Sequence, residues 1–370
     1  MSYDVAVIGA GIVGAACAYC LSSEGLSVAI IDADGVSSGT TAAGMGHIVI
    51  MDDSPAQLAL TSYSQKLWSQ LAPELPQQCE FENCGTLWAA ADDDEMMEVR
   101  SKHSLYAENG IKTEILDSFM LRDVEPNLRS DLAGALLVPG DKVVYQMCAT
   151  SFFIEQSVEQ GAKLHFGKRA AAISADRVEL DKGLRINAKF VINAAGINAP
   201  KLSPGIAITS RKGHLVVTDR YSGFVRHQIV ELGYLKSAHG HDSSSVAFNV
   251  QPRATGQVII GSSRQFGIDD KNIDHAIVRR MTSRAFDYMP GLKQLSAIRV
   301  WTGFRPATPD NLPYIGRLST SENVLIAAGH EGLGITTSIG TGQIITDMIL
   351  GREPAIPAEP YSPDRRIQKN

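Results

Sequence analysis

The sequence predicts an α/β fold joined to a second domain, of α+β type, built on a largely antiparallel sheet. Residues 4–8, 12–24 and 27–31 read in turn as a strand, a helix and a strand. Residues 206–263 instead carry short apolar runs separated by turn residues, which is typical of antiparallel strands. A chain of 370 residues is long enough for two domains with full-sized cores.

Helical and strand-like segments alternate along the rest of the chain. Helices are expected at 54–71, 93–109, 150–161, 274–288 and 335–350. Strands are expected at 85–90, in pieces at 163–181, at 190–194 and at 324–328. The proline-rich segment 354–363 is expected to be extended.

Composition and charge exclude several classes of protein. Lys plus Arg is 34 against 40 Asp plus Glu, so no basic field exists for nucleic acid. With 44% hydrophobic residues the chain is not disordered, and five scattered cysteines do not suggest a secreted disulfide framework. The opening segment does not resemble a signal peptide, and no apolar run reaches the roughly 18 residues of a membrane span. A cytoplasmic location is expected, with peripheral attachment at the inner membrane as an alternative.

A glycine-rich turn follows the first predicted strand. Gly9, Gly11 and Gly14 form G-A-G-I-V-G, and Asp32 lies 18 residues beyond Gly14 at the end of the next strand. In a Rossmann-type domain these glycines allow a tight turn, close approach of a pyrophosphate and close helix–strand packing, while the carboxylate binds a ribose. The pattern therefore predicts dinucleotide binding; the alternative is a glycine-rich turn in a flavodoxin-like or unrelated α/β fold.

Two further segments favour FAD over NAD, which the glycine pattern alone does not distinguish. Residues 37–46 are small, and their free N–H groups suit a longer cofactor. Residues 327–336 predict a strand, a glycine turn and a helix start, and a helix N-terminus stabilises the anionic N1–C2=O edge of a reduced flavin. An ordinary glycine-rich connection is the alternative for the second segment.

A set of motifs carries a family resemblance along the whole chain. The motifs are G-A-G-I-V-G at 9–14, T-T-A-A-G-M at 40–45, N-A-A-G at 193–196, G-F-R-P at 303–306, P-Y-I-G at 313–316 and A-A-G-H-E-G-L-G-I-T at 327–336. In this order they resemble the glycine oxidase and D-amino-acid dehydrogenase group of the D-amino-acid-oxidase-type flavoproteins. The resemblance implies a GR2-like FAD-binding domain formed by 1–80, 145–205 and 296–370, and a substrate-binding domain formed by 81–144 and 206–295.

The resemblance also implies which residues contact a non-covalent FAD. They belong to the first glycine turn, the second strand end, the small-residue loop, a neighbouring strand and the last glycine turn. They are Gly9, Gly11, Ile12, Val13, Gly14, Asp32, Ala33, Ser38, Gly39, Thr40, Ala43, Gly44, Met45, Ala170, Gly196, Gly329, His330, Glu331, Gly332, Leu333, Gly334, Ile335 and Thr336.

Catalytic roles are implied for two residues. Arg305, in G-F-R-P, matches the arginine with which such enzymes clamp the substrate carboxylate, and a planar guanidinium suits that bidentate contact. His47 resembles an active-site histidine of D-amino-acid dehydrogenases and is expected to contact the substrate or the flavin. The alternatives are a surface ion pair for Arg305 and a buried structural role for His47.

The substrate pocket departs from the family pattern at two positions. A second arginine of glycine oxidases aligns with Gly332, and a tyrosine that assists the carboxylate clamp aligns near Phe248 or Asn249. We therefore expect Phe248 and Gly332 to line a pocket with fewer polar anchors. Arg264 is a further substrate-binding candidate, with an exposed ion pair as its alternative.

Three other sequence patterns do not indicate a functional site. The C-x-x-C of Cys17 and Cys20 lies inside the first helix, where small side chains serve packing. His239, His241 and Asp242 lack further ligands at zinc spacing, so no metal is expected. No G-x-S-x-G motif suggests a serine hydrolase.

The resemblance implies oxidation of a small amino acid to its imine by hydride transfer to flavin. Residues 251–266 resemble hydroxyproline dehydrogenases and the catalytic subunits of opine oxidases and hydrogen cyanide synthase, which favours a D-amino acid or a cyclic secondary amino acid such as D-proline or cis-4-hydroxy-D-proline. The electron acceptor is expected to be a quinone of the respiratory chain or O2, and partner subunits are compatible. The alternatives are a glycine- or sarcosine-type oxidase, an opine-oxidase-like catalytic subunit, a non-catalytic FAD subunit and an NAD-linked dehydrogenase.

Overall fold

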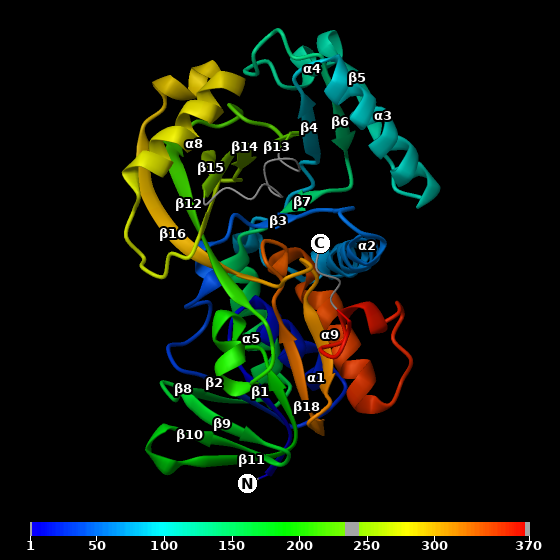
Figure 1. Cartoon of the computed structure of the whole chain (residues 1–370), viewed down its shortest axis with the longest axis vertical. Helices are drawn as coiled ribbons and strands as arrows, with labels where there is room; N and C mark the ends of the chain where they lie inside the picture. The colour runs from blue at the N-terminus through cyan, green and yellow to red at the C-terminus, as the bar shows by residue number, and fades with distance from the viewer. Residues whose placement is uncertain (1, 234–243, 367–370) are drawn as a thin grey trace. The chain divides into compact units, whose positions relative to one another are not determined.

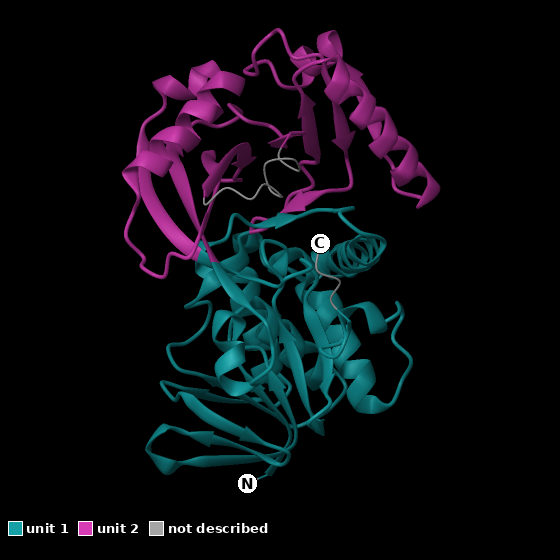
Figure 2. Cartoon of the chain, viewed as in Figure 1, with its two compact units in different colours: residues 1–79, 145–210, 304–370 teal, residues 80–144, 211–303 magenta. Residues whose placement is uncertain are grey.

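The chain divides into two compact units. The computed structural model describes residues 2–233 and 244–366. The first unit contains Met1–Cys79, Tyr145–Ser210 and Phe304–Asn370, and the second contains Glu80–Val144 and Arg211–Gly303 (Figure 2). The third piece of the first unit begins at Phe304, inside strand β16 (Ala297–Ala307), which pairs with the sheet of the second unit; the predicted piece begins at 296. The assignment of cofactor and substrate to the two units remains a prediction.

The first unit is built on a mixed sheet whose centre is parallel (Figure 1). The strands lie in the order β17 (Tyr314–Leu318), β18 (Ser321–Ala328), β11 (Arg185–Asn193), β1 (Ser2–Ile8), β2 (Val28–Asp32) and β8 (Lys163–Phe166). Neighbours from β18 to β8 are parallel, whereas β17 is antiparallel to β18. A short antiparallel extension adds β10 (Arg177–Leu180) and β9 (Ala170–Ser174) beside β11.

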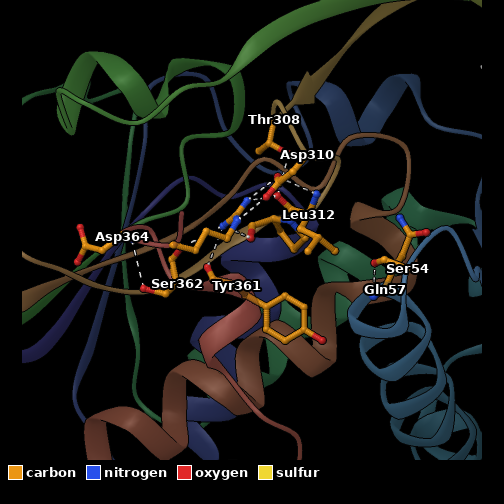
Figure 3. Close-up of polar contacts among 10 residues, drawn as sticks. Ser54, Gln57, Thr308, Asp310, Leu312, Tyr361, Ser362 and Asp364 are labelled. Carbon is orange, nitrogen blue, oxygen red and sulfur yellow. Dashed lines mark hydrogen bonds and ion pairs between the residues drawn. The ribbon is translucent and has the colours of Figure 1, made fainter. Parts of the chain in front are cut away.

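Helices accompany these strands in the first unit. They are α1 (Ile12–Ser23), α2 (Pro55–Leu71), α5 (Gln146–Glu159), the short α6 (Ala199–Leu202) and α9 (Gly334–Leu350), with β3 (His47–Ile48) and the 3-10 turn η1 (Thr40–Ala43) in the loop after β2. Ser54 caps α2 by accepting from the Gln57 N–H (Figure 3), as Ser-Pro at a helix start predicts. A Cβ on Gly342 would lie 2.7 Å from the Ala16 carbonyl oxygen, so glycine allows α9 to approach α1 closely.

The second unit is a sheet with helices. Its strand order is β16, β12 (Thr209–Arg220), β15 (Gln257–Phe266), β14 (Ser244–Pro252), β13 (Gln228–Glu231), β4 (Thr86–Ala90), β6 (Gly134–Val138) and β5 (Glu114–Asp117). Helices α3 (Asp93–Glu108), α4 (Ser118–Val124) and α8 (His275–Tyr288) accompany it, and β7 (Lys142–Val143) lies at the end of its first segment. Antiparallel pairs predominate, but β13 and β4 are parallel.

The predicted fold class is therefore confirmed, with sheets that are mixed and not strictly antiparallel. The predicted helix at 150–161 begins earlier, at Gln146, because apolar residues on both sides of residue 150 face the core. Among residues 2–233 and 244–366, no helix is long and apolar enough to cross a membrane, and no His, Cys, Asp and Glu side chains gather as a metal site. The loop of His239, His241 and Asp242 lies outside the described residues.

Candidate cofactor and active site

The three glycines of the first turn meet different surroundings. Gly9 has φ +112°, and a Cβ there would lie 2.4 Å from the Ala194 carbonyl oxygen. A Cβ on Gly14 would lie 2.0 Å from the Gly9 carbonyl oxygen. Gly11 has an ordinary φ of −72°, and its Cβ would meet only Thr41 Oγ1, at 3.2 Å. Packing of the protein itself explains Gly9 and Gly14, whereas open space beside Gly11 leaves room for another molecule.

Helices α1 and α9 begin at the same edge of the first sheet. Each follows a parallel strand, β1 or β18, and neither N-cap residue, Gly11 or Leu333, makes a side-chain capping bond. Val13 Cγ2 lies 3.9 Å from where a Cβ on Gly334 would be, so the two N-termini are neighbours. Thr41 Oγ1 accepts from the Ile12 N–H at 3.0 Å, and the other backbone N–H groups of the two helix starts, with their partial positive charge, suit an anionic cofactor.

Asp32 has more partners than the sequence suggests. Its Oδ2 accepts from the Ala10 N–H at 2.7 Å, and its Oδ1 accepts from the N–H groups of Asp34 at 2.8 Å and Gly35 at 2.9 Å. A carboxylate has about four acceptor positions. The side chain thus shapes the loops after β1 and β2 and keeps capacity for a ribose hydroxyl.

The small-residue loop lies against the other predicted cofactor segments. Thr40 Oγ1 donates to the Phe304 carbonyl oxygen at 2.7 Å, which ties the loop to the end of β16. Gln146 Nε2 donates to the Gly44 carbonyl oxygen at 2.8 Å. A Cβ on Gly44 would lie 2.9 Å from Ile335 Cδ1, so the loop also packs on the start of α9. Segments far apart in sequence meet here, within one unit.

The last glycine turn is fixed to the strand that carries Arg305. Gly329 has φ +84°, and a Cβ there would lie 2.5 Å from Thr308 Cγ2. The Glu331 N–H donates to the Pro306 carbonyl oxygen at 2.9 Å. A Cβ on Gly332 would lie 3.8 Å from Arg305 Nε, so the absent side chain leaves space beside the half-buried guanidinium.

His47 also contacts Gly332. Its Nε2 is 3.1 Å from the Gly332 carbonyl oxygen, which only accepts, so Nε2 carries the proton. Burial lowers the pKa of His47 to about 4; the bond to Gly332 opposes this shift and the charge of Arg305 adds to it. The imidazole is therefore neutral, and its buried Nδ1 has a lone pair without a hydrogen-bond partner among the described residues.

Two side chains that support this arrangement are absent from the sequence prediction. Trp68 Nε1 of α2 donates to the carbonyl oxygens of Ile335 and Thr336, at 3.2 and 3.0 Å. Gln146 fixes Gly44, as described above. Neither residue belongs to a glycine-rich motif. The one signal in the sequence is a tryptophan or a glutamine in a predicted helix, which does not by itself indicate a role in the site. The Thr336 hydroxyl also donates to the His47 carbonyl oxygen, at 3.1 Å.

Some predicted site residues are placed elsewhere. The His330 side chain is buried against α9, with Nε2 3.0 Å from Thr341 Oγ1, so only its backbone faces the turn. Phe248 has no exposed surface; it belongs to the core of the second unit and stacks on Tyr288 with ring centroids 4.7 Å apart. The Phe248 side chain therefore has no exposed surface for the predicted substrate contact.

The remaining candidates have simpler surroundings. Arg264 of β15 is 9% exposed, which does not fit its alternative as an exposed ion pair. Ala170 begins β9 and pairs with Leu180. Cys17 and Cys20 are buried in α1; burial raises the pKa of the Cys20 thiol to about 12, so this pair is unreactive.

Comparison with known proteins identifies the family. A family model described as FAD dependent oxidoreductase (DAO) matches residues 4–348. The chain belongs to this family. The predicted FAD cofactor and oxidoreductase class are confirmed by this membership.

Individual relatives are distant but cover the whole chain. The glycine oxidase of Geobacillus kaustophilus is 26% identical over 382 residues, which cover 99% of this chain and 98% of that protein. The hydrogen cyanide synthase subunit HcnC of Pseudomonas protegens is 26% identical over 408 residues, with 96% and 94% covered. The crystal structure of the Geobacillus kaustophilus glycine oxidase matches with a TM-score of 0.89 at 25% identity, covering 99% of this chain and 100% of that one. The L-proline dehydrogenase of P. horikoshii shares the fold, with a TM-score of 0.89 at 24% identity over 98% of this chain and 97% of that one.

Proposed function

We propose that this protein catalyses the FAD-dependent oxidation of a small amino acid to the corresponding imine. The observation that carries the proposal is the placement of Arg305 and neutral His47 next to Gly332, beside the start of α9. Distant relatives named glycine oxidase support the same class of substrate.

The first unit contains residues that fit FAD. The space beside Gly11 at the start of α1 suits a pyrophosphate, the start of α9, which has no side-chain cap, suits a flavin edge, and the spare acceptor capacity of Asp32 suits a ribose. When bound, FAD supplies the two-electron acceptor for the oxidation.

Arg305 would bind the substrate carboxylate. Its guanidinium is half-buried, so a bidentate carboxylate contact there is weakened little by solvent. Fixing the carboxylate also fixes the α-carbon, and such orientation is the main contribution that this chemistry needs from the protein.

His47 would hold the turn that carries Gly332 beside the substrate. Its Nε2 donates to the Gly332 carbonyl oxygen and its Nδ1 is buried, so the imidazole would act by positioning this turn. A low pKa keeps the imidazole neutral, and it therefore does not repel the cationic Arg305. The substrate reacts as the free amine, so its reaction rate should rise with pH as the ammonium proton is lost.

A compact or cyclic side chain is the finer proposal. Gly332 leaves space beside Arg305 where glycine oxidases carry a second arginine, and a ring such as that of D-proline or cis-4-hydroxy-D-proline suits this space. Glycine is the second candidate substrate, since several relatives are named glycine oxidase. The relative named HcnC, a subunit of hydrogen cyanide synthase, supports a partner subunit as a further possibility.

A side-by-side assay tests the proposal. Dye reduction and peroxide release are measured for D-proline, hydroxyproline isomers, glycine, sarcosine and acyclic D-amino acids. We expect cyclic substrates to react fastest and dye reduction to exceed peroxide release. If glycine is turned over faster than the cyclic amino acids, glycine is the substrate and the cyclic proposal is wrong. Peroxide release equal to dye reduction would indicate an oxidase. No turnover of any amino acid would overturn the proposed function.

A further inference from the structure

The C-terminal segment carries a nearly buried arginine, Arg365, that binds one loop of the first unit. Arg365 has 8% of its side chain exposed and forms a bidentate pair with Asp310, Nε–Oδ2 2.7 Å and Nη2–Oδ1 2.8 Å. It also donates to the carbonyl oxygens of Leu312 at 2.7 Å and Pro313 at 3.1 Å, and its guanidinium lies 4.2 Å from the centroid of the Tyr314 ring. Loop 308–313 is thus held by hydrogen bonds from a residue more than 50 positions away in sequence.

The same guanidinium is held in place from its own side. Nη1 donates to the carbonyl oxygens of Tyr361 and Ser362, at 3.2 and 3.1 Å, and the Tyr361 hydroxyl donates to the Ala56 carbonyl oxygen at 2.6 Å. Figure 3 shows Asp310 and Leu312 drawn together with Tyr361 and Ser362 at this point. The guanidinium of an arginine is planar and carries five N–H groups. Because those of Arg365 have acceptors on several sides, the group is fixed in one position.

Loop 308–313 follows directly on β16, the strand that carries Arg305. Asp310 follows Arg305 by five residues, and the intervening Thr308 donates to the Leu312 carbonyl oxygen at 2.8 Å. The Thr308 methyl group fills the space at Gly329, and Pro306 accepts from the Glu331 N–H. Movement of the loop would therefore displace both the backbone of Arg305 and the turn that carries Gly332.

We propose that Arg365 is a positioning residue for Arg305: through Asp310 it holds loop 308–313, and so holds the guanidinium of Arg305 where it meets the substrate carboxylate. This inference rests on the proposed function, in which Arg305 binds that carboxylate. The Asp310 carboxylate is needed for the same positioning, because it is the partner through which Arg365 holds the loop. Burial raises the pKa of Asp310, but the hydrogen bonds and charge of Arg365 outweigh it and lower that pKa, so the carboxylate is charged in the working range.

The test measures binding of acetate, the simplest carboxylate with an α-carbon, through its perturbation of flavin absorbance in the FAD-loaded protein. The variants are Arg365→Gln, Arg365→Lys, Asp310→Asn and Arg305→Met. Arg352→Gln is the matched control, because Arg352 forms an equally short bidentate pair with Glu24, at 2.7 Å, away from this loop. FAD content and thermal unfolding are measured for every variant.

We expect Arg365→Gln and Asp310→Asn to weaken acetate binding about tenfold with FAD retained, and Arg365→Lys to restore part of it. A misplacement of about 1 Å can cost about 100-fold, and a smaller displacement of Arg305 should cost less. The control should bind acetate as the wild type does. Unchanged acetate binding in all three loop variants, alongside its loss in Arg305→Met, would overturn the positioning role and leave the proposed function intact. Unchanged binding in Arg305→Met would instead overturn the proposed function. If Arg365→Gln fails to fold, acetate binding by Arg365→Lys and Asp310→Asn is compared with the wild type in the same way.

Discussion

Substitution of Gly11 by alanine should separate FAD binding from stability. The new Cβ would lie 3.2 Å from Thr41 Oγ1, which accepts from the Ile12 N–H at 3.0 Å. Loss of that bond and of a glycine N-cap costs about 1 kcal/mol each, so the apoprotein should unfold only a few degrees lower. The methyl group occupies the space left for the pyrophosphate, and removing charge-assisted contacts there costs roughly 2–4 kcal/mol, or about 30- to 1,000-fold in FAD affinity.

Gly14→Ala is the matched contrast for Gly11→Ala. Its Cβ would lie 2.0 Å from the Gly9 carbonyl oxygen, and overpacking against backbone should destabilise even the apoprotein by about 3 kcal/mol or more. FAD is titrated into each apoprotein by flavin fluorescence, and stability is measured by urea unfolding. A Gly11→Ala protein that binds FAD with wild-type affinity would refute the reasoning, as would a Gly14→Ala apoprotein with wild-type stability.

Three further predictions concern single side chains. Arg305→Met should lower kcat/KM about 30- to 1,000-fold, roughly 2–4 kcal/mol, and Arg305→Lys should recover only part of it; unchanged kinetics would exclude the carboxylate contact. Gly332→Ala should be tolerated because its Cβ lies 3.8 Å from Arg305 Nε, whereas Gly332→Leu should raise KM for cyclic substrates; equal KM values would contradict this. Burial lowers the pKa of His330 to about 3, so acidification below about pH 6.5 protonates the unfolded chain first and destabilises the fold. Between about pH 7 and pH 5, the His330→Asn apoprotein should lose about 2 kcal/mol less stability than the wild type in urea unfolding, and an equal loss would contradict the assignment.

The fold was largely predictable because its signals are local. The strand, the glycines and Asp32 are close in sequence, and alternation of apolar residues identified the second sheet. The parallel pairing of β13 with β4 was not predictable, since it joins residues far apart in sequence, Gln228 to Thr86. The earlier start of α5 at Gln146 had no capping signal, because Tyr145 makes no side-chain cap.

The candidate site was predictable only where a motif marks it. G-F-R-P and the last glycine turn marked Arg305 and Gly332 as candidates, but did not predict that His47 Nε2 donates to the Gly332 carbonyl oxygen. Phe248 was a candidate because a family tyrosine aligns near it, but alignment does not show which face of the sheet a side chain takes, and Phe248 lies in the core of the second unit. Arg365 follows no motif, and its role depends on folding of the C-terminal segment against loop 308–313.

Anaerobic mixing of the FAD-loaded protein with single amino acids tests the central claim most directly. The account predicts that a small amino acid, a cyclic one fastest, bleaches the flavin absorbance band in the wild type, and that Arg305→Met with a full complement of FAD bleaches at least about 30-fold more slowly at low substrate concentration. A flavin band that a chemical reductant bleaches but no amino acid does would contradict the account.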